Sequence, residues 1–226
     1  MAVSGSTNFE LDVADYIEEA FERCGLEVRN GYDLKTAKRS MNLMFAEWAN
    51  RGLNQWTIEQ RTQTVTQGTA AYLLGTDVID VLSMAVRQGT GTSQADINMS
   101  RIGRDAFLSI PNKNTQARPT QFFIDRQIIP EINVWPTPNN STDILVFDVL
   151  TRIDDADTTA NTLAVPFRFY PCLAAGLAYY LAIKKAPDKV TMLKSFYEEE
   201  LSRALAEDRD RASFNISPNL QNYRVG

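Results

Sequence analysis

The feature that most limits the possible folds is a run of 15 residues, Phe169–Ile183, that is apolar almost throughout. The run is shorter than the ~20 residues that a membrane-spanning helix needs. The surrounding segment, Pro166–Ala186, places apolar side chains on most sides of a helix, which is typical of a helix at the centre of a bundle. The sequence therefore predicts a buried central helix, which other amphipathic helices must cover.

Three amphipathic segments near the two ends of the chain supply such helices. Thr7–Gly25 begins with a threonine and Glu10 at the spacing of a capping box, and it ends at a glycine suited to a left-handed cap. Asp33–Arg51 carries an apolar stripe behind a capping aspartate, and Asp188–Ser213 carries another stripe before a charged end. We expect these helices to pack around the central one.

The segment between these helices, residues 56–165, has the alternating patterns and turn residues of β-structure. We expect a small inserted antiparallel β domain of about five strands, with a short helix near residues 100–110. The predicted strands are Trp56–Thr66, Asp77–Arg87, Gln121–Arg126, Pro130–Trp135 and Thr142–Ile153. The prediction is thus an α+β fold in which residues 1–55 and 166–213 form one helical bundle domain.

The chain ends in a segment, residues 214–226, that has apolar side chains but no helical period, and we expect an extended tail. Two interpretations remain open. Ordered apolar tails often bury against a partner, whereas many termini are simply disordered. The apolar positions concerned are Phe214, Ile216, Pro218, Leu220 and Tyr223.

Composition excludes several classes of function. The chain contains no histidine, which removes Ser-His-Asp and Cys-His catalysis and histidine-ligated metal sites. Cys24 and Cys172 are far apart and indicate buried thiols in a reducing compartment. The net charge of −5 does not favour a protein that grips nucleic acid, although it is compatible with an acidic channel past which DNA slides. Met1–Asn8 lacks a secretory signal pattern, so we expect a soluble protein without a membrane segment.

Three local patterns could carry chemistry, and each has a simpler interpretation. Gly89–Gln94, GTGTSQ, lacks the lysine of a phosphate-binding loop and is better interpreted as a mobile hairpin tip. The acidic loop at Asp154 lacks the glycine and distal glutamate of a calcium loop. Glu47, beside Trp48, is the carboxylate most suited to a glycosidase, but nothing places a second carboxylate at the required separation. We therefore expect no metal, no cofactor and no catalytic residue.

Four motifs, in this order and spacing, resemble the head-to-tail adaptor proteins of short-tailed double-stranded DNA phages. The helix and strand start at Leu43–Thr62 read LMFAEWANRGLNQWTIEQRT. The hairpin at Gln121–Asn139 reads QFFIDRQIIPEINVWPTPN, and the apolar helix at Val165–Pro187 reads VPFRFYPCLAAGLAYYLAIKKAP. The charged helix end at Ala204–Ser213 reads ALAEDRDRAS. The resemblance is weakest over Val81–Pro119.

The resemblance implies a structural virion protein, assembled in the host cytoplasm. Such adaptors form a ring, commonly a dodecamer, between the portal and the tail nozzle, and the ring extends the DNA channel. The implied partners are the portal, nozzle and fibre proteins, while double-stranded DNA passes without specific binding. The C-terminal apolar residues named above are then the candidate portal contacts. The candidate contacts to a neighbouring subunit or the nozzle are Phe122, Ile124, Ile132 and Trp135.

Two functions from other classes compete with the adaptor interpretation. The first alternative is a tail-associated cell-wall hydrolase, which the missing catalytic constellation disfavours. The second is a DNA-binding packaging factor, which the acidic balance and the lack of a basic helix disfavour.

Overall fold

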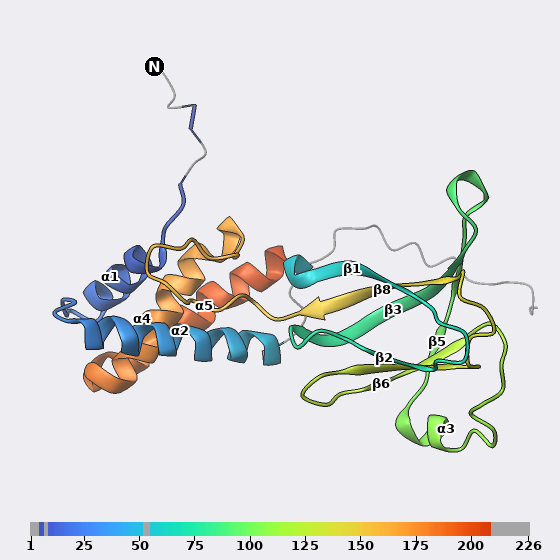
Figure 1. Ribbon diagram of the computed structural model, residues 1–226. Helices are drawn as coiled ribbons and strands as arrows, with labels where there is room; N and C mark the ends of the chain where they lie inside the picture. The colour runs from blue at the N-terminus through green and yellow to red at the C-terminus, as the bar shows by residue number, and fades with distance from the viewer. Residues whose placement is uncertain (1–4, 7–8, 52–54, 209–226) are drawn as a thin grey trace, which may run out of the picture.

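The computed structural model describes residues 5–6, 9–51 and 55–208 of the chain. Figure 1 shows the long helices gathered at one end of the molecule and the strands, together with a short helix, at the other. The helical part consists of α1 (Val13–Arg23), α2 (Gly31–Arg51), α4 (Tyr170–Lys185) and α5 (Val190–Glu207). The first two come from the N-terminal region and the last two from the C-terminal region, as the sequence predicts. The α+β class is confirmed.

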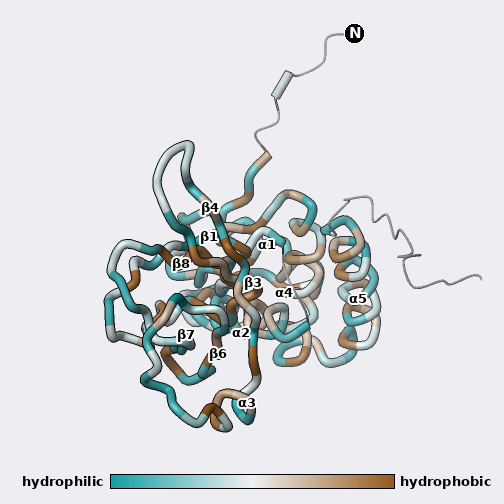
Figure 2. Tube along the Cα trace, turned by 90° about the vertical axis from the view of Figure 1, so that its right-hand side faces the viewer, coloured by the Kyte–Doolittle hydropathy of each residue, from teal (hydrophilic) through white to brown (hydrophobic). Residues whose placement is uncertain are grey.

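The apolar helix α4 is the centre of the helical part. It packs against α1, α2 and α5, which lie on different sides of it (Figure 2). Ala175, Leu177 and Ala178 are buried, as are most other residues along its length. Among helices of the described residues, none is both long and apolar enough to span a membrane. The all-round apolar pattern therefore corresponds to burial by neighbouring helices.

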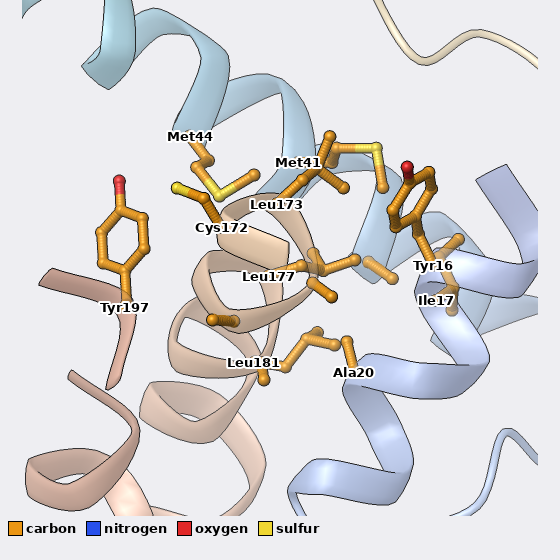
Figure 3. Packing of buried hydrophobic residues seen from close by; sticks show 14 of the residues in the cluster. Tyr16, Ile17, Ala20, Met41, Met44, Cys172, Leu173, Leu177, Leu181 and Tyr197 are labelled. Carbon is orange, nitrogen blue, oxygen red and sulfur yellow. The ribbon is translucent and has the colours of Figure 1, made fainter. Parts of the chain in front are cut away.

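A glycine in α4 allows the neighbouring helices to approach closely. A Cβ atom built at Gly176 would collide with the sulfur of Met44 and would lie 2.8 Å from a ring carbon of Tyr197. Figure 3 shows Met44 and Tyr197 beside α4, together with other side chains of this core. The glycine costs helix stability, but it creates the space that the larger side chains of α2 and α5 occupy.

The start of α1 differs from the predicted start. The cap is Asp12, whose carboxylate accepts a hydrogen bond from the Asp15 backbone N–H, while the Asp15 carboxylate accepts one from the Asp12 N–H. This is a true capping box, five residues later than the predicted one at Thr7, a residue outside the described ranges. Gly25, with φ of +72°, follows the helix end as predicted.

The start of α2 is also shifted. The helix begins at Gly31, and the side chain of Asn30 accepts a hydrogen bond from the Asp33 N–H at 3.0 Å. Asp33 lies inside the first turn, where its carboxylate accepts the Arg29 N–H and pairs with Lys185 of α4. The predicted capping role of Asp33 is therefore wrong, because Asn30 fills it.

The β part is a sandwich of two four-stranded sheets. The first sheet has the order β1 (Ile58–Thr64), β8 (Ile144–Thr151), β3 (Val78–Gln88) and β4 (Ala95–Asn98). The second has the order β2 (Ala71–Leu73), β7 (Glu131–Trp135), β6 (Gln121–Asp125) and β5 (Ser100–Arg101). All pairings are antiparallel except that of β5 with β6, which is parallel. The hairpin between β3 and β4 extends beyond both sheets (Figure 1).

Three short strands escaped prediction. These strands, β2, β4 and β5, have only two to four residues each, too few to show an alternating pattern. The predicted helix near residues 100–110 exists as α3 (Arg104–Leu108), but its first predicted residues form β5. Four short 3₁₀ segments complete the described chain: η1 (Gln55–Thr57), η2 (Gly91–Ser93), η3 (Phe167–Phe169) and η4 (Pro187–Lys189).

The molecule has two separate apolar cores. One lies in the helical part and includes Trp48, Phe169 and Tyr197. The other fills the space between the two sheets and includes Phe122 and Phe147. Because each core is made by its own set of elements, the helical part and the β part each have a basis for cohesion.

Candidate interaction surfaces

A chain of polar contacts holds α5 against α2. The indole N–H of Trp48 donates to the hydroxyl of Tyr197 at 2.8 Å, and that hydroxyl donates to the Glu47 carboxylate at 2.7 Å. Arg51 donates to Glu47 and makes a two-pronged contact with Glu198, at 2.6 and 2.8 Å. Burial raises the pKa of Tyr197, as does its hydrogen bond to Glu47. Glu47, the residue considered for glycosidase chemistry, is therefore part of a contact between two helices.

A second polar contact fixes the C-terminal end of α5. The carboxylate of Asp208, which is buried, accepts hydrogen bonds from Arg168 of η3 and from the backbone N–H of Gln55. The Arg168 guanidinium lies 6.0 Å from the centre of the Trp56 ring and 5.8 Å from that of Phe169. The end of the last helix is thus joined to the point where the chain passes from helices to strands.

A groove of about 570 Å³ runs between α1 and the start of α4, and we call it the α1 groove. Its apolar side includes Phe9 and Phe167, which are 61% and 69% exposed. Phe167 packs edge-on against Tyr170, which in turn packs against the buried Tyr16. The charged side consists of four carboxylates and one guanidinium: Asp15, Glu18, Glu19, Glu22 and Arg23. The groove therefore combines an aromatic floor with an acidic rim.

The β part has an exposed apolar patch at one hairpin tip, which we call the β6–β7 tip. Ile128 is 88% exposed and Ile129 is 45% exposed. Leu73, on the edge strand β2, is also exposed, and the neighbouring Leu74 N–H donates to the Pro130 carbonyl at 2.8 Å. Three large aliphatic side chains thus belong to adjoining backbone segments on the surface. Exposed large apolar side chains that are grouped in this way are candidates for a binding surface.

The structure places three of the four predicted contact residues inside the subunit. Phe122, Ile124 and Ile132 are all buried in the core between the sheets, so their side chains are not available to a neighbour. The edges of their hairpin are covered as well, because β2 pairs with β7 and β5 pairs with β6. Trp135 is half-buried, and its indole N–H donates to the Asn112 carbonyl at 3.2 Å.

The predicted portal contacts lie outside the described residues. These are Phe214, Ile216, Pro218, Leu220 and Tyr223, and they remain predictions. The described chain ends at Asp208, whose position is fixed by the Arg168 contact described above.

The other candidate sites do not assemble into a recognisable centre. Within residues 5–6, 9–51 and 55–208, no three histidine, cysteine, aspartate or glutamate side chains are grouped so as to hold a metal ion. Gly89–Gln94 forms the turn of the β3–β4 hairpin around η2. Both cysteines are buried, and burial raises the pKa of the thiols of Cys24 and Cys172. These thiols pack as small apolar groups.

Sequence reasoning missed both the α1 groove and the β6–β7 tip. A signal for the groove existed, because Asp15, Glu18, Glu19 and Glu22 share the helix side that does not carry the apolar stripe. The aromatic floor could not be anticipated, since Phe167 is distant in sequence from α1. The β6–β7 tip lies within one of the four motifs of the family resemblance. Nothing in the sequence, however, indicates that its two isoleucines are exposed.

Comparison with known proteins identifies the family. The model of the family described as SU10 adaptor protein matches residues 11–221. No curated protein matches the chain. Among solved structures, a chain described as the neck of an empty GTA particle, computed with C6 symmetry, gives a TM-score of 0.29 at 10% sequence identity, covering 84% of this chain and 93% of that one. Because the family match spans nearly the whole sequence, the protein belongs to the SU10 adaptor protein family.

Proposed function

We propose that this protein is a structural head-to-tail adaptor of a phage virion. In this role it forms a ring between the portal and the tail nozzle and extends the channel through which DNA leaves the head. The observation that carries the proposal is the family match over residues 11–221. The order of the four motifs noted in the sequence supports the same role. We propose a structural rather than an enzymatic function, and Glu47, the best catalytic candidate, is already bound to Tyr197 and Arg51.

The proposed ring is a closed homo-oligomer, and a dodecamer is our expected copy number. In a ring, each subunit uses two different surfaces to contact its two neighbours. The β6–β7 tip, with Ile128 and Ile129, is our candidate for one such surface or for the nozzle contact. Trp135 is half-buried, so it remains a candidate contact to a neighbouring subunit or the nozzle. The buried residues of the same hairpin belong to the core between the sheets instead.

The proposed portal contact combines the helical part with the C-terminal segment, residues 214–226. The apolar residues of that segment are the candidate anchors in the portal surface. The nozzle and fibre proteins lie on the other side of the ring in this proposal. DNA passes without specific binding, a role that suits a net charge of −5 because like charges limit adhesion to phosphate.

We also propose that the chain is divided into domains with different roles. Residues 1–55 and 166–213 form the helical bundle domain, residues 56–165 form the inserted β domain, and residues 214–226 form the tail. The separate apolar cores of the helical part and the β part support a division into two domains, but Ile153, Ala156 and Val165, near the end of the inserted segment, belong to the helical core. The helical domain then serves the portal and the β domain serves neighbours or the nozzle.

A gene disruption in the phage tests the role directly. A nonsense mutation in the gene for this protein should leave heads that package DNA but carry no tail, and supplying the protein in trans should restore infectious particles. The cell-wall hydrolase alternative predicts complete particles that fail to penetrate the host wall. Complete tailed particles from the mutant would contradict the adaptor role.

A further inference from the structure

Both sides of the α1 groove carry side chains that are available to contact a ligand. Phe9 and Phe167, which line the groove, are both largely exposed. On the acidic rim, Arg23 pairs with Glu19 at 2.7 Å, while Glu18 and Glu22 have no ion-pair partner among the described residues. A ligand that fits this groove should carry apolar side chains for the floor and cations for the rim.

The last described residue, Asp208, contacts η3, the segment that supplies Phe167 to the groove. Asp208 accepts a hydrogen bond from Arg168. Phe167, the residue before Arg168, lines the groove. Eighteen further residues, 209–226, follow Asp208 in the sequence. A segment of that length can span about 60 Å when extended, so reach along the groove is not limiting.

The composition of residues 209–226 complements the groove. The segment carries Arg209, Arg211 and Arg224 against a single acidic residue, Asp210. Its apolar side chains include Phe214. The segment therefore contains cations and an aromatic ring, which complement the carboxylates and aromatic rings of the groove.

We propose that, in the free protomer, residues 209–226 dock in the α1 groove of their own chain. The apolar side chains of the segment lie on the Phe9 and Phe167 surface, and its arginines lie along Glu18 and Glu22. A tethered segment has an effective concentration in the millimolar range, so even a weak site on the same chain is occupied before a distant one. The portal must then compete for the segment, a consequence that rests on the proposed adaptor function, whereas the docking itself does not.

Photo-crosslinking in the full-length protein tests the docking. A benzoylphenylalanine in place of Phe214 should crosslink to residues of the α1 groove, within a product of monomer mass, as read by mass spectrometry. The same photo-reactive residue in place of Phe196, which is exposed on α5, is the control and should give no crosslink to the groove. Raising the salt concentration should reduce the yield, because the rim contacts are exposed ion pairs.

Charge reversal at the rim provides a second readout. Glu18→Lys with Glu22→Lys should reduce the crosslink yield several-fold, as expected for two exposed ion pairs. The matched control, Glu27→Lys with Asp188→Lys, makes the same change in net charge at exposed positions that do not line the groove. Circular dichroism checks that each variant is folded.

Three results would overturn the proposal: crosslinks from position 214 to other surfaces, crosslinks only between chains at a yield that rises with protein concentration, or equal losses in the rim and control variants. Portal binding by the full chain is scored separately. A chain that docks its own tail but does not bind the portal refutes the adaptor role alone, and one that binds the portal without docking refutes the inference alone.

Discussion

The indole N–H of Trp48 donates a hydrogen bond to the hydroxyl of Tyr197, 149 residues later, at 2.8 Å. Both side chains are buried, and the Tyr197 hydroxyl in turn donates a hydrogen bond to the Glu47 carboxylate. Because an unsatisfied buried donor is costly, Tyr197→Phe should lower the free energy of unfolding by about 1–3 kcal/mol. Urea denaturation followed by circular dichroism measures this. The control Tyr32→Phe, at an exposed site, should change it by less than about 0.5 kcal/mol.

The close approach of three helices at Gly176 makes a second prediction. Gly176→Ala adds a methyl group that collides with Met44 and Tyr197, so overpacking should cost about 1–3 kcal/mol despite the better helix propensity of alanine. Gly31→Ala is the matched control, because a Cβ at Gly31 meets no atom within 4 Å. The melting temperatures of the two variants should shift in different directions or by clearly different amounts. Equal stability of both variants would refute the packing argument.

The pH dependence of stability follows from Asp33. The hydrogen bond from Lys185 holds the pKa of the Asp33 carboxyl below its ordinary value, and the Arg29 backbone N–H contributes in the same direction. A carboxyl whose pKa is lower in the folded state contributes stability above its unfolded pKa of about 3.9 and loses it as the pH falls through the folded value. Stability should therefore drop below about pH 4.

Asp33→Asn tests this assignment. The variant should have lower stability at neutral pH and a smaller loss on acidification, as measured by urea midpoints between neutral and acidic pH. Neutralising the exposed Asp188 by the same substitution controls for the change in net charge. An unchanged acid slope in Asp33→Asn would show that other carboxyls, such as Asp77 and Glu198, account for it.

The exposed β6–β7 tip makes a prediction about assembly. Ile128→Ser with Ile129→Ser should leave the unfolding free energy nearly unchanged, because both side chains are already in contact with water. The same variant should reduce ring formation on the portal or nozzle attachment, counted in electron micrographs. Ile97→Ser, on the exposed strand β4, is the control. Normal rings with an attached nozzle in the tip variant would exclude this surface as a contact.

Removal of residues 214–226 tests the predicted portal contact. A chain that stops at Ser213 retains every residue of the described structure, so its circular dichroism spectrum and melting temperature should be close to those of the full chain. Portal binding, measured by co-sedimentation, should be lost. Unchanged binding would show that the helical part alone engages the portal.

Some elements of the fold were predictable because their signals are long. The apolar run at Phe169–Ile183 could only be a central helix or a membrane segment, and its length decided between them. The 21-residue helix α2 likewise carries its stripe over several turns. The caps were harder, since Thr7 and Asp12 both begin acceptable capping boxes, and only the packing of Val13 onto the core selects the second.

The surface assignments were less predictable, because a strand pattern does not say what covers each face. The hairpin residues Phe122 and Ile132 face the other sheet. Phe123 points to the opposite side, where Phe107 of α3 stacks on it at 5.3 Å. Thus both faces of β6 are covered, and the exposed apolar residues lie at the tip. The α1 groove could be identified only from the fold, because its two walls come from segments that are far apart in the sequence.

Electron microscopy of this protein mixed with its cognate portal tests the central claim most directly, with the protein alone as the control. The adaptor role predicts a ring of copies stacked coaxially on the narrow end of the portal, and the images would also give the copy number. A folded protein that does not associate with the portal under any salt condition would contradict the role.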